Sequence, residues 1–232
     1  MELLDALRST GAVREFTDEP VSDESLARIL DAARFAPSGG NRQGWRVVVV
    51  RDPETRRAVR DLYLPGWYEY LAIASASAQL TPFAPVTDRD AETAALANAS
   101  ALAAAAADGP GGFAEHLDTV PVLLVLFADL RALAAMDRDS DRYQFTGGAS
   151  VYPFAWSVLL AAREEGLGGV MTTMNIRRES EVKTLLHAGP ELALAAVIAL
   201  GHPVHAARRL RRARVDELVT IDRIDGPGFG AS

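Results

Sequence analysis

The sequence predicts an α/β fold of two or three layers, in which helices pack on a central sheet. Two observations support this prediction. Continuous apolar segments of strand length occur at 45–51, 121–128 and 192–200, and segments with helical periodicity separate them. The chain has 232 residues, of which 49% are hydrophobic and 24% charged, so it suits a single domain with a sizeable core.

The N-terminal part is predicted to contain three helices and one strand. Residues 2–9 form a short helix with three leucines on one face. A second helix starts near Ser22, a good N-cap with acidic residues after it, and Pro37 stops it. The β-branched segment 45–51 is typical of a strand buried on both faces. A third helix follows over 53–63.

The rest of the chain is predicted to alternate in the same way. Residues 64–86 mix aromatic residues with prolines and glycine, which indicates loop and short helix, and residues 88–107 form one alanine-rich helix before a glycine-rich turn. The tail is basic and then glycine-rich, and we expect it to be flexible from 222 to 232. The remaining predicted elements are a strand at 121–128, a helix at 151–165, a short strand at 170–174, a helix at 178–187 and a strand at 192–200.

Composition and charge exclude several classes of function. The net charge of −7 disfavours nucleic-acid binding, which needs a basic surface. The chain has no cysteine, so disulfides, thiolate zinc sites and cysteine nucleophiles are excluded, and the histidines show no metal-ligand spacing. No segment is apolar enough to span a membrane, and the N-terminus lacks the features of a signal peptide, so we expect a cytoplasmic protein.

Two arginine-containing segments are candidate phosphate sites. Residues 8–14 (RSTGAVR) place two arginines around hydroxyl side chains, and guanidinium groups bind phosphate through charge-assisted hydrogen bonds. Residues 208–214 (RRLRRAR) concentrate five arginines in an acidic protein. The alternatives are a solvated helix end for the first segment, and a solvated basic face or polyanion contact for the second.

Two glycine-containing segments are candidate sites for a flat ligand. Residues 36–45 (APSGGNRQGW) combine an irregular backbone with Ser38, Asn41 and Gln43, whose side chains make directional polar contacts. Residues 165–169 (EGLGG) follow a helix and could direct backbone amides at a flavin ring. An ordinary turn and a glycine C-cap are the respective alternatives.

Together these segments resemble the FMN-dependent nitroreductase family. The order R-x5-R-x-F, P-S-x-x-N-x-Q-x-W, G-L-G-G, and G-H-P before an arginine cluster is similar to that family over nearly the whole chain. The residues that carry the resemblance are Arg8, Arg14, Phe16, Pro37, Ser38, Asn41, Gln43, Trp45, Gly168, Gly169, Gly201, Pro203 and Arg212.

The resemblance implies an α+β fold, a three-layer α/β/α sandwich with a mainly antiparallel sheet, and an interlocked homodimer with FMN at the subunit interface. It implies that Arg8 and Arg212, or Arg211, hold the phosphate, that Arg14 faces the ring or ribityl chain, and that the loop around Ser38 comes from the other subunit. Gly168 and Gly169 would tune the ring. The implied cofactor-binding set is Arg8, Ser9, Arg14, Pro37, Ser38, Gly39, Asn41, Gln43, Gly168, Gly169, Arg211 and Arg212.

The implied activity is reduction of quinones, nitroaromatics or similar conjugated molecules by NAD(P)H in a ping-pong cycle, with the flavin rather than a protein side chain carrying the chemistry.

The chain departs from the family pattern at Gly11 and Ala12, where a basic residue or serine is common, and at Gly44, where proline is usual. Residues 60–120, the region in which family members place substrate-specific insertions, match no motif that we recognise. The alternatives are a deazaflavin (F420) enzyme, suggested by the alanine- and arginine-rich composition, and a flavin-storing or flavin-sensing protein.

Two smaller features complete the predictions. Residues 67–70 (WYEY) are either a lid that stacks on a flat substrate or packing anchors in a loop. The carboxylate pair Glu164–Glu165 is interpreted as solvated surface.

Overall fold

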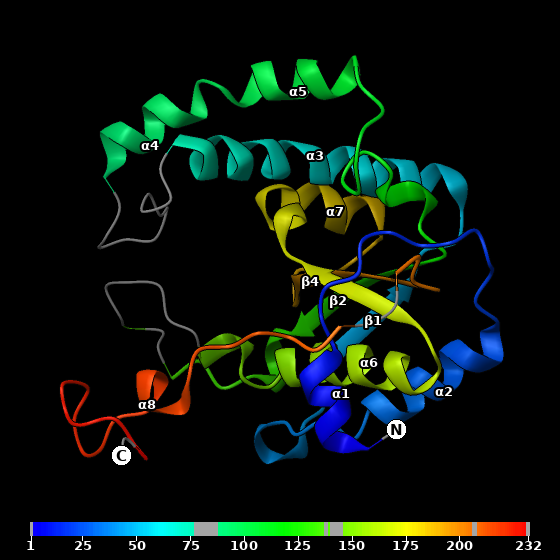
Figure 1. Ribbon diagram of the computed structural model, residues 1–232. Coiled ribbons are helices and arrows are strands. Elements are labelled where there is room, and N and C mark those ends of the chain that lie inside the picture. The colour runs from blue at the N-terminus through cyan, green and yellow to red at the C-terminus, as the bar shows by residue number, and fades with distance from the viewer. Residues whose placement is uncertain (1, 77–87, 137–138, 140–145, 206–207, 231–232) are drawn as a thin grey trace.

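A four-stranded sheet forms the centre of the computed structural model, which describes residues 2–76, 88–136, 139, 146–205 and 208–230 (Figure 1). The strands are β1 (Trp45–Val49), β2 (Val122–Asp129), β3 (Gly168–Thr172) and β4 (Leu192–Gly201), in the order β1-β2-β4-β3. Every pairing between these strands is antiparallel, so the mainly antiparallel sheet expected from the resemblance is confirmed.

Strand β2 explains why the sheet is covered on both sides. All eight of its residues are buried. Successive side chains of a strand point to opposite faces. Leu124 and Leu126 therefore join one core cluster, while Leu123, Val125 and Phe127 join a second one on the opposite face. The unbroken apolar segment thus supplies both cores of a three-layer sandwich.

One face is covered by α1 (Leu3–Ser9), α2 (Asp23–Ala33) and α6 (Tyr152–Glu164), as Figure 1 shows. The Ser22 side chain caps α2 by accepting a hydrogen bond from the Ser25 N–H, as predicted. Leu26 and Ile29 of α2 are buried in the core that this face forms with β2. The predicted apolar stripe is therefore what attaches α2 to the sheet.

The opposite face is covered by α3 (Pro53–Ala76) and α7 (Glu179–Leu185), and α4 (Arg89–Leu96) and α5 (Ala99–Ala107) lie outside α3 (Figure 1). The last helix, α8 (Val215–Leu218), lies apart from the sheet at the end of an extended segment. Beyond it, the Phe229 N–H donates to the Val219 carbonyl and the Ile221 N–H to the Pro227 carbonyl. None of the helices in the described ranges is both long and apolar enough to cross a membrane.

Two predictions are wrong for α3. It continues 13 residues past the expected end at residue 63, and the aromatic segment 64–76, which was expected to be loop and short helix, is part of this one long helix. Pro65 removes one backbone hydrogen bond from the helix. Burial of Tyr63, Tyr68 and Ala72 on the core side of α3 offsets that loss. The remainder of the predicted loop, 77–86, lies outside the described residues.

The alanine-rich segment is two helices rather than the single one predicted over 88–107. The Asp88 carboxylate caps α4 by accepting from the N–H groups of Asp90 and Ala91. The Asn98 N–H donates to the Ala95 carbonyl three residues back. This tighter bond interrupts the α-helical pattern between α4 and α5.

Strand β1 is less buried than predicted, since the segment 45–51 was expected to be covered on both faces. Arg46 is exposed and the valines at 47–49 are only half-buried. Within the described residues β1 pairs with β2 alone, so it is an edge strand.

Strand β3 begins at Gly168 instead of the predicted residue 170, because Gly168 pairs with Gly201 at the end of β4.

Candidate functional site

Three of the four segments singled out in the sequence meet at one end of the sheet, beside the start of β3. The Val13 N–H donates to the Gly169 carbonyl (2.9 Å), and Ala12 and Gly169 form a parallel bridge. The Leu210 N–H donates to the Arg8 carbonyl (2.8 Å). Residues 8–14, the first glycines of β3 and the arginine-rich segment therefore lie side by side.

Close packing on two sides of β3 requires its first two glycines. A side chain at Gly168 would place its Cβ 2.6 Å from Val13 Cγ2, and one at Gly169 would place its Cβ 2.5 Å from the Ala199 carbonyl oxygen. Neither distance is compatible with a real Cβ. Glycine at 168 lets the N-terminal segment pack directly on the edge of β3, and glycine at 169 lets β3 lie close to β4 and α6.

A pocket of about 430 Å³ opens where these segments meet. Of the predicted cofactor-binding set, Ser9, Arg14 and Gly168 line it. The Ser9 hydroxyl already donates to the Asp5 carbonyl (2.7 Å), so it can offer a ligand only acceptor capacity. The arginine-rich segment contributes Arg208 to the lining, together with Leu210.

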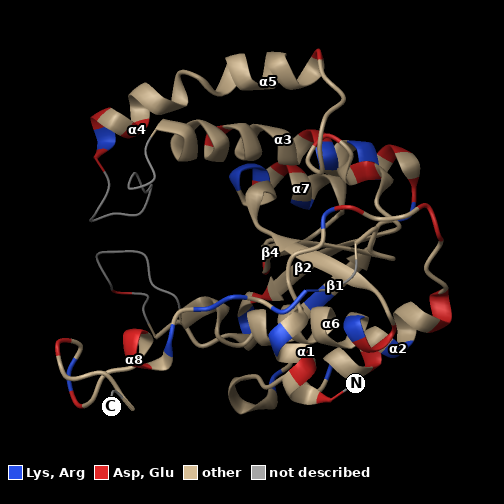
Figure 2. Ribbon diagram, viewed as in Figure 1, with Lys and Arg blue, Asp and Glu red and all other residues tan. Residues whose placement is uncertain are grey.

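The pocket is strongly cationic. Arg14, Arg163 and Arg208 line it, and among the described residues none of their side chains has an ion-pair or hydrogen-bond partner. Glu15, the carboxylate in the lining, is paired with His205 (Oε2 to Nε2, 3.2 Å). Figure 2 shows basic residues gathered along the extended segment that leads to α8. Three guanidinium groups against the single carboxylate of Glu15 give this lining a net positive charge, which favours an anionic ligand.

Two buried polar atoms without partners lie in this region. They are Arg163 Nε, at the end of α6, and Thr10 Oγ1, next to the pocket-lining Ser9. A buried donor without an acceptor is costly unless a ligand satisfies it. The structure therefore fits a ligand with several acceptor oxygens, such as a phosphate group.

Arg163 was missed at the level of sequence. It lies in the last turn of α6, where a basic residue also favours the helix dipole, so nothing in its local pattern marks it as a ligand. Its place in the pocket depends on how α6 packs beside residues 9–15. Its distance of three residues from the G-L-G-G segment is the one sequence signal that could have drawn attention to it.

Several predicted residues lie outside the lining of this pocket. Arg8 contributes its backbone carbonyl to the pairing with Leu210. Arg212 is exposed and donates to the carbonyl of Arg211, and neither of these two arginines borders the pocket. Gly169 is buried inside β3.

The segment 36–45 forms a separate, internally bonded loop. The Ser38 hydroxyl accepts from the Gln43 N–H (3.0 Å), and Ser150 Oγ accepts from the Gly39 N–H (3.0 Å). Asn41 and Gln43 have φ values of 54° and 50°, a conformation that non-glycine residues adopt rarely. None of these loop residues, nor Pro37 before them, lines the 430 Å³ pocket of the same chain.

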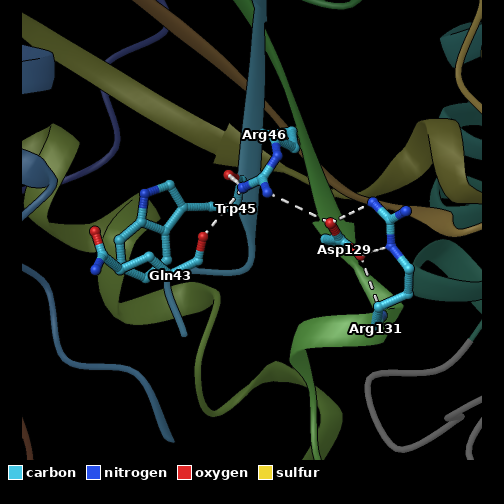
Figure 3. A network of polar contacts seen from close by, with 5 residues as sticks. All are labelled: Gln43, Trp45, Arg46, Asp129 and Arg131. Carbon is cyan, nitrogen blue, oxygen red and sulfur yellow. Dashed lines mark hydrogen bonds and ion pairs between the residues drawn. The ribbon is translucent and has the colours of Figure 1, made fainter. Parts of the chain in front are cut away.

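A charged network anchors this loop to the end of β2 (Figure 3). Arg46 donates to the Gln43 carbonyl (3.1 Å) and to Asp129 Oδ2 (3.4 Å). Arg131 donates to both carboxylate oxygens of Asp129, at 2.9 and 2.8 Å. These hydrogen bonds, from Arg131 above all, lower the pKa of Asp129 to about 2, so the carboxylate stays charged in ordinary buffers. The network of Arg46, Asp129 and Arg131, which we call the Asp129 clamp, therefore keeps its ion pairs.

A larger groove of about 1380 Å³ adjoins the same end of the sheet, and Arg14 and Glu15 line both the groove and the pocket. Phe16, Trp67 and Phe113 give the groove an aromatic lining. Trp67 stacks between Tyr63 and Tyr70 along α3, with ring centroids 6.3 and 5.7 Å apart. Among the charged residues that also line this wide groove, these aromatic side chains offer flat surfaces on which a conjugated small molecule can stack.

The segment 67–70 belongs to α3, which corrects the expectation of a loop. Tyr68 is buried, and its hydroxyl donates to Glu115 Oε1 (2.7 Å). Burial and this carboxylate raise the pKa of Tyr68 to about 12. Glu115 also accepts from the Gly112 N–H, so this contact ties the loop before β2 to α3 and stabilises one wall of the groove.

Known proteins resemble this chain in sequence and in fold. The nitroreductase family model matches residues 7–202. The NADH dehydrogenase of Thermus thermophilus is 31% identical over 209 residues, which is 90% of each chain. Among solved structures, a BluB-like flavoprotein from Clostridium difficile 630 has a TM-score of 0.68 at 21% identity, over 96% of this chain and 100% of its own.

A second solved structure, of a variant of the FMN- and NADPH-dependent nitroreductase from sphigopyxis sp. strain HMH, has a TM-score of 0.65 at 24% identity. It covers 96% of this chain and 100% of its own. The similarity to both structures therefore extends over the sheet and the helices on both of its faces.

Proposed function

This chain belongs to the nitroreductase family, and we propose on that premise that it is a flavin-dependent oxidoreductase with FMN as cofactor and NAD(P)H as electron donor. The acceptor would be a small conjugated molecule such as a quinone or a nitroaromatic. The same premise supports a homodimer as the working form.

The observation that carries the proposal is the cationic pocket beside β3. Arg14, Arg163 and Arg208 have no partners among the described residues, and they converge at the place where the N-terminal segment packs on Gly168. Guanidinium groups match the oxygens of a phosphate group in geometry and charge. A flavin nucleotide that places its phosphate here would extend toward the adjoining groove.

Arg14 is the residue that links the phosphate end to the reaction end, because it lines both the pocket and the groove. FMN, when bound, would supply the redox chemistry by accepting hydride from NAD(P)H and passing it to the acceptor. Arg14 would stabilise negative charge on the reduced ring, and backbone groups near Gly168 and Gly169 would hydrogen-bond its edge.

The groove would bind the donor and the acceptor in turn. Trp67 and Phe113 offer flat apolar surfaces for a nicotinamide or a conjugated acceptor, and their bulk would keep water from the reacting faces. Since both substrates would occupy the same space, NAD(P)H would leave before the acceptor enters. This sequence corresponds to a ping-pong cycle.

The loop 36–45 supports the dimer part of the proposal. It is held rigid by Ser38, by Ser150 and by the Asp129 clamp, yet it does not border the pocket of its own chain. A rigid polar loop with no ligand contact in its own subunit is available to complete a site in a second copy. Ser38, Gly39 and Asn41 would then contact the cofactor across the interface.

The experiment that tests this function starts with the absorption spectrum of the freshly purified protein. We expect the two flavin bands, loss of the longer-wavelength band on anaerobic addition of NADH or NADPH, and its return when a quinone is added. A colourless protein that fails to bind added FMN would contradict the proposal. Tighter binding of F420 than of FMN would move the cofactor assignment to a deazaflavin, and bound FMN that NAD(P)H cannot reduce would indicate storage or sensing.

A further inference from the structure

Arg163 is the pocket residue that comes from outside all four segments singled out in the sequence. It lies in the last turn of α6, and it lines the 430 Å³ pocket together with the N-terminal segment. The Nε atom is buried and has no hydrogen-bond partner among the described residues. A guanidinium group in this position lacks the acceptor that burial ordinarily demands.

Two carboxylates of this region, Glu165 and Glu15, have other side chains as partners. Glu165, two residues further along, binds Arg28 of α2 through both oxygens, at 2.9 and 2.6 Å. Glu15, in the pocket wall, is paired with His205. Arg163 lines the pocket together with Arg14 and Arg208, which carry the same charge.

Like charges in one small pocket repel each other, so this arrangement is stabilised by an anion that bridges them. A phosphomonoester suits the arrangement best, because it carries nearly two charges and three terminal oxygens, and each oxygen can accept from a guanidinium fork. Arg163 and Arg208 approach the pocket from different elements, the end of α6 and the segment after β4. Such an arrangement can hold two oxygens of one phosphate group.

We propose that Arg163, together with Arg208, binds the terminal phosphate of the flavin nucleotide and makes this site selective for FMN over unphosphorylated riboflavin. The inference rests on the proposed function and adds a residue of α6 to the phosphate site. Since Gly11 and Ala12 leave the N-terminal segment without side-chain donors between Thr10 and Arg14, Arg163 supplies a cation from a different element of the fold.

The test is a pair of titrations of the flavin-free protein, with FMN and with riboflavin, followed by the quenching of flavin fluorescence. Arg163→Gln is expected to weaken FMN binding about tenfold or more and to leave riboflavin binding unchanged, because loss of a charge-assisted hydrogen bond affects the phosphate alone. Arg163→Lys keeps the positive charge but loses the forked geometry of the guanidinium group. Its affinity for FMN should lie between those of the wild type and Arg163→Gln. Arg209→Gln removes an arginine that lies next to Arg208 but outside the pocket lining, and it is expected to change FMN binding less than about twofold.

Equal weakening of FMN and riboflavin by Arg163→Gln, or no effect on either, would overturn the proposal. A selective loss of NADPH binding relative to NADH, with an unchanged ratio of FMN to riboflavin affinity, would also overturn it. That outcome would assign the residue to the phosphate of the dinucleotide.

A second measurement separates this inference from the proposed function. Inorganic phosphate is expected to raise the midpoint of thermal unfolding of the flavin-free wild-type protein. The Arg163→Gln variant should lose most of that rise, whereas Arg209→Gln should keep it. An equal rise in wild type and Arg163→Gln would contradict an anion site at Arg163 even if the protein binds FMN. If Arg163→Gln loses the phosphate-induced rise in unfolding midpoint but the wild-type protein binds no flavin, the anion site stands and only the cofactor assignment is rejected.

Discussion

Glu165 shows at the scale of single residues how a carboxylate ties two helices of the structure together. Arg28 of α2 donates to both of its oxygens, and Ser25 Oγ donates to Oε2 at 2.9 Å. These hydrogen bonds lower the pKa of Glu165 from 4.5 to about 2. The prediction of solvated surface was therefore wrong for Glu165, whose side chain is only 22% exposed.

The depressed pKa predicts how stability depends on pH. A carboxylate with a lower pKa in the folded state stabilises the fold above its unfolded pKa, and that contribution disappears as pH falls through the folded value. The contribution of Glu165 should therefore be complete above about pH 4.5 and lost by about pH 2. Urea unfolding of wild type and Glu165→Gln at several pH values tests this.

We expect the difference in urea midpoint between the two proteins to be largest at neutral pH and to shrink steadily below pH 4.5. Arg34→Gln is the control, because it removes an exposed ion pair with Asp31 on the same helix α2. An exposed pair contributes little. A pH-independent difference for Glu165→Gln would show that the Arg28 contact does not lower the carboxylate pKa.

At the scale of elements, the close packing of α3 on the 3₁₀ segment Met174–Arg178 decides the course of the longest helix. Gly66 makes this contact possible. A Cβ at Gly66 would be 2.5 Å from the Met174 carbonyl oxygen and 3.2 Å from Arg177 Cγ. The backbone of one element therefore rests directly against the other, next to Pro65.

Gly66→Ala tests how tight this packing is. Alanine normally favours a helix by about 1 kcal/mol over glycine. Here the added methyl group meets a backbone carbonyl, so we expect a net loss of about 1–3 kcal/mol in the free energy of unfolding. Gly147→Ala is the matched control, since none of the described residues lies within 4 Å of a Cβ there. Urea titration measures both, and a stabilised Gly66→Ala protein would mean that α3 packs more loosely than described.

The network of Arg46, Asp129 and Arg131 links β1 to β2 near the opposite edge of the sheet. Asp129→Asn keeps the shape of the side chain but weakens its contacts with Arg46 and Arg131. We expect faster hydrogen exchange of the backbone amides at 38–46, because these contacts hold the strained loop in place. Amides of β4 serve as the internal control. Unchanged exchange in the loop would mean that Ser38 and Ser150 suffice to hold it.

At the scale of the whole molecule, exposed apolar side chains mark the surface that a second copy would cover. Leu3 and Leu4 of α1 are 66% and 58% exposed, and Trp156 of the adjoining α6 is 39% exposed. The arm that carries α8 adds Leu218 and Ile224, at 69% and 95%. Exposed apolar groups favour association, and the arm would reach around the partner in the proposed interlocked dimer.

The proposed dimer is tested by a charge at Trp156, one of these exposed side chains. Trp156→Glu is expected to convert the dimer to a monomer and to lower FMN affinity in parallel, because interface tryptophans contribute strongly to association and the loop 36–45 would be withdrawn from the site. Light scattering after gel filtration gives the mass. Ala97→Glu, on the α4–α5 layer across the sheet (Figure 1), should remain dimeric. A monomeric wild-type protein with full flavin occupancy would contradict a shared site.

The sequence by itself determined the elements whose signals are local. The apolar segments at 121–128 and 192–200 predicted β2 and β4, since strands buried on both faces need no polar alternation. Ser22 and Pro37 predicted the ends of α2. The order of the four segments predicted the family, because the residue types in each segment are not accounted for by the local secondary structure alone.

Only the tertiary structure decided which of these residues meet. Arg163 and Arg208 enter the pocket, and α3 continues through Pro65, because of contacts between residues far apart in the sequence. Local helix or strand propensity and the spacing of motifs carry no information about such long-range contacts. The close approach of Val13 to Gly168 brings the charged groups together, and the burial of Tyr63 and Tyr68 offsets the proline in α3. Both effects exist only once the chain has packed, which is why no window of the sequence could predict them.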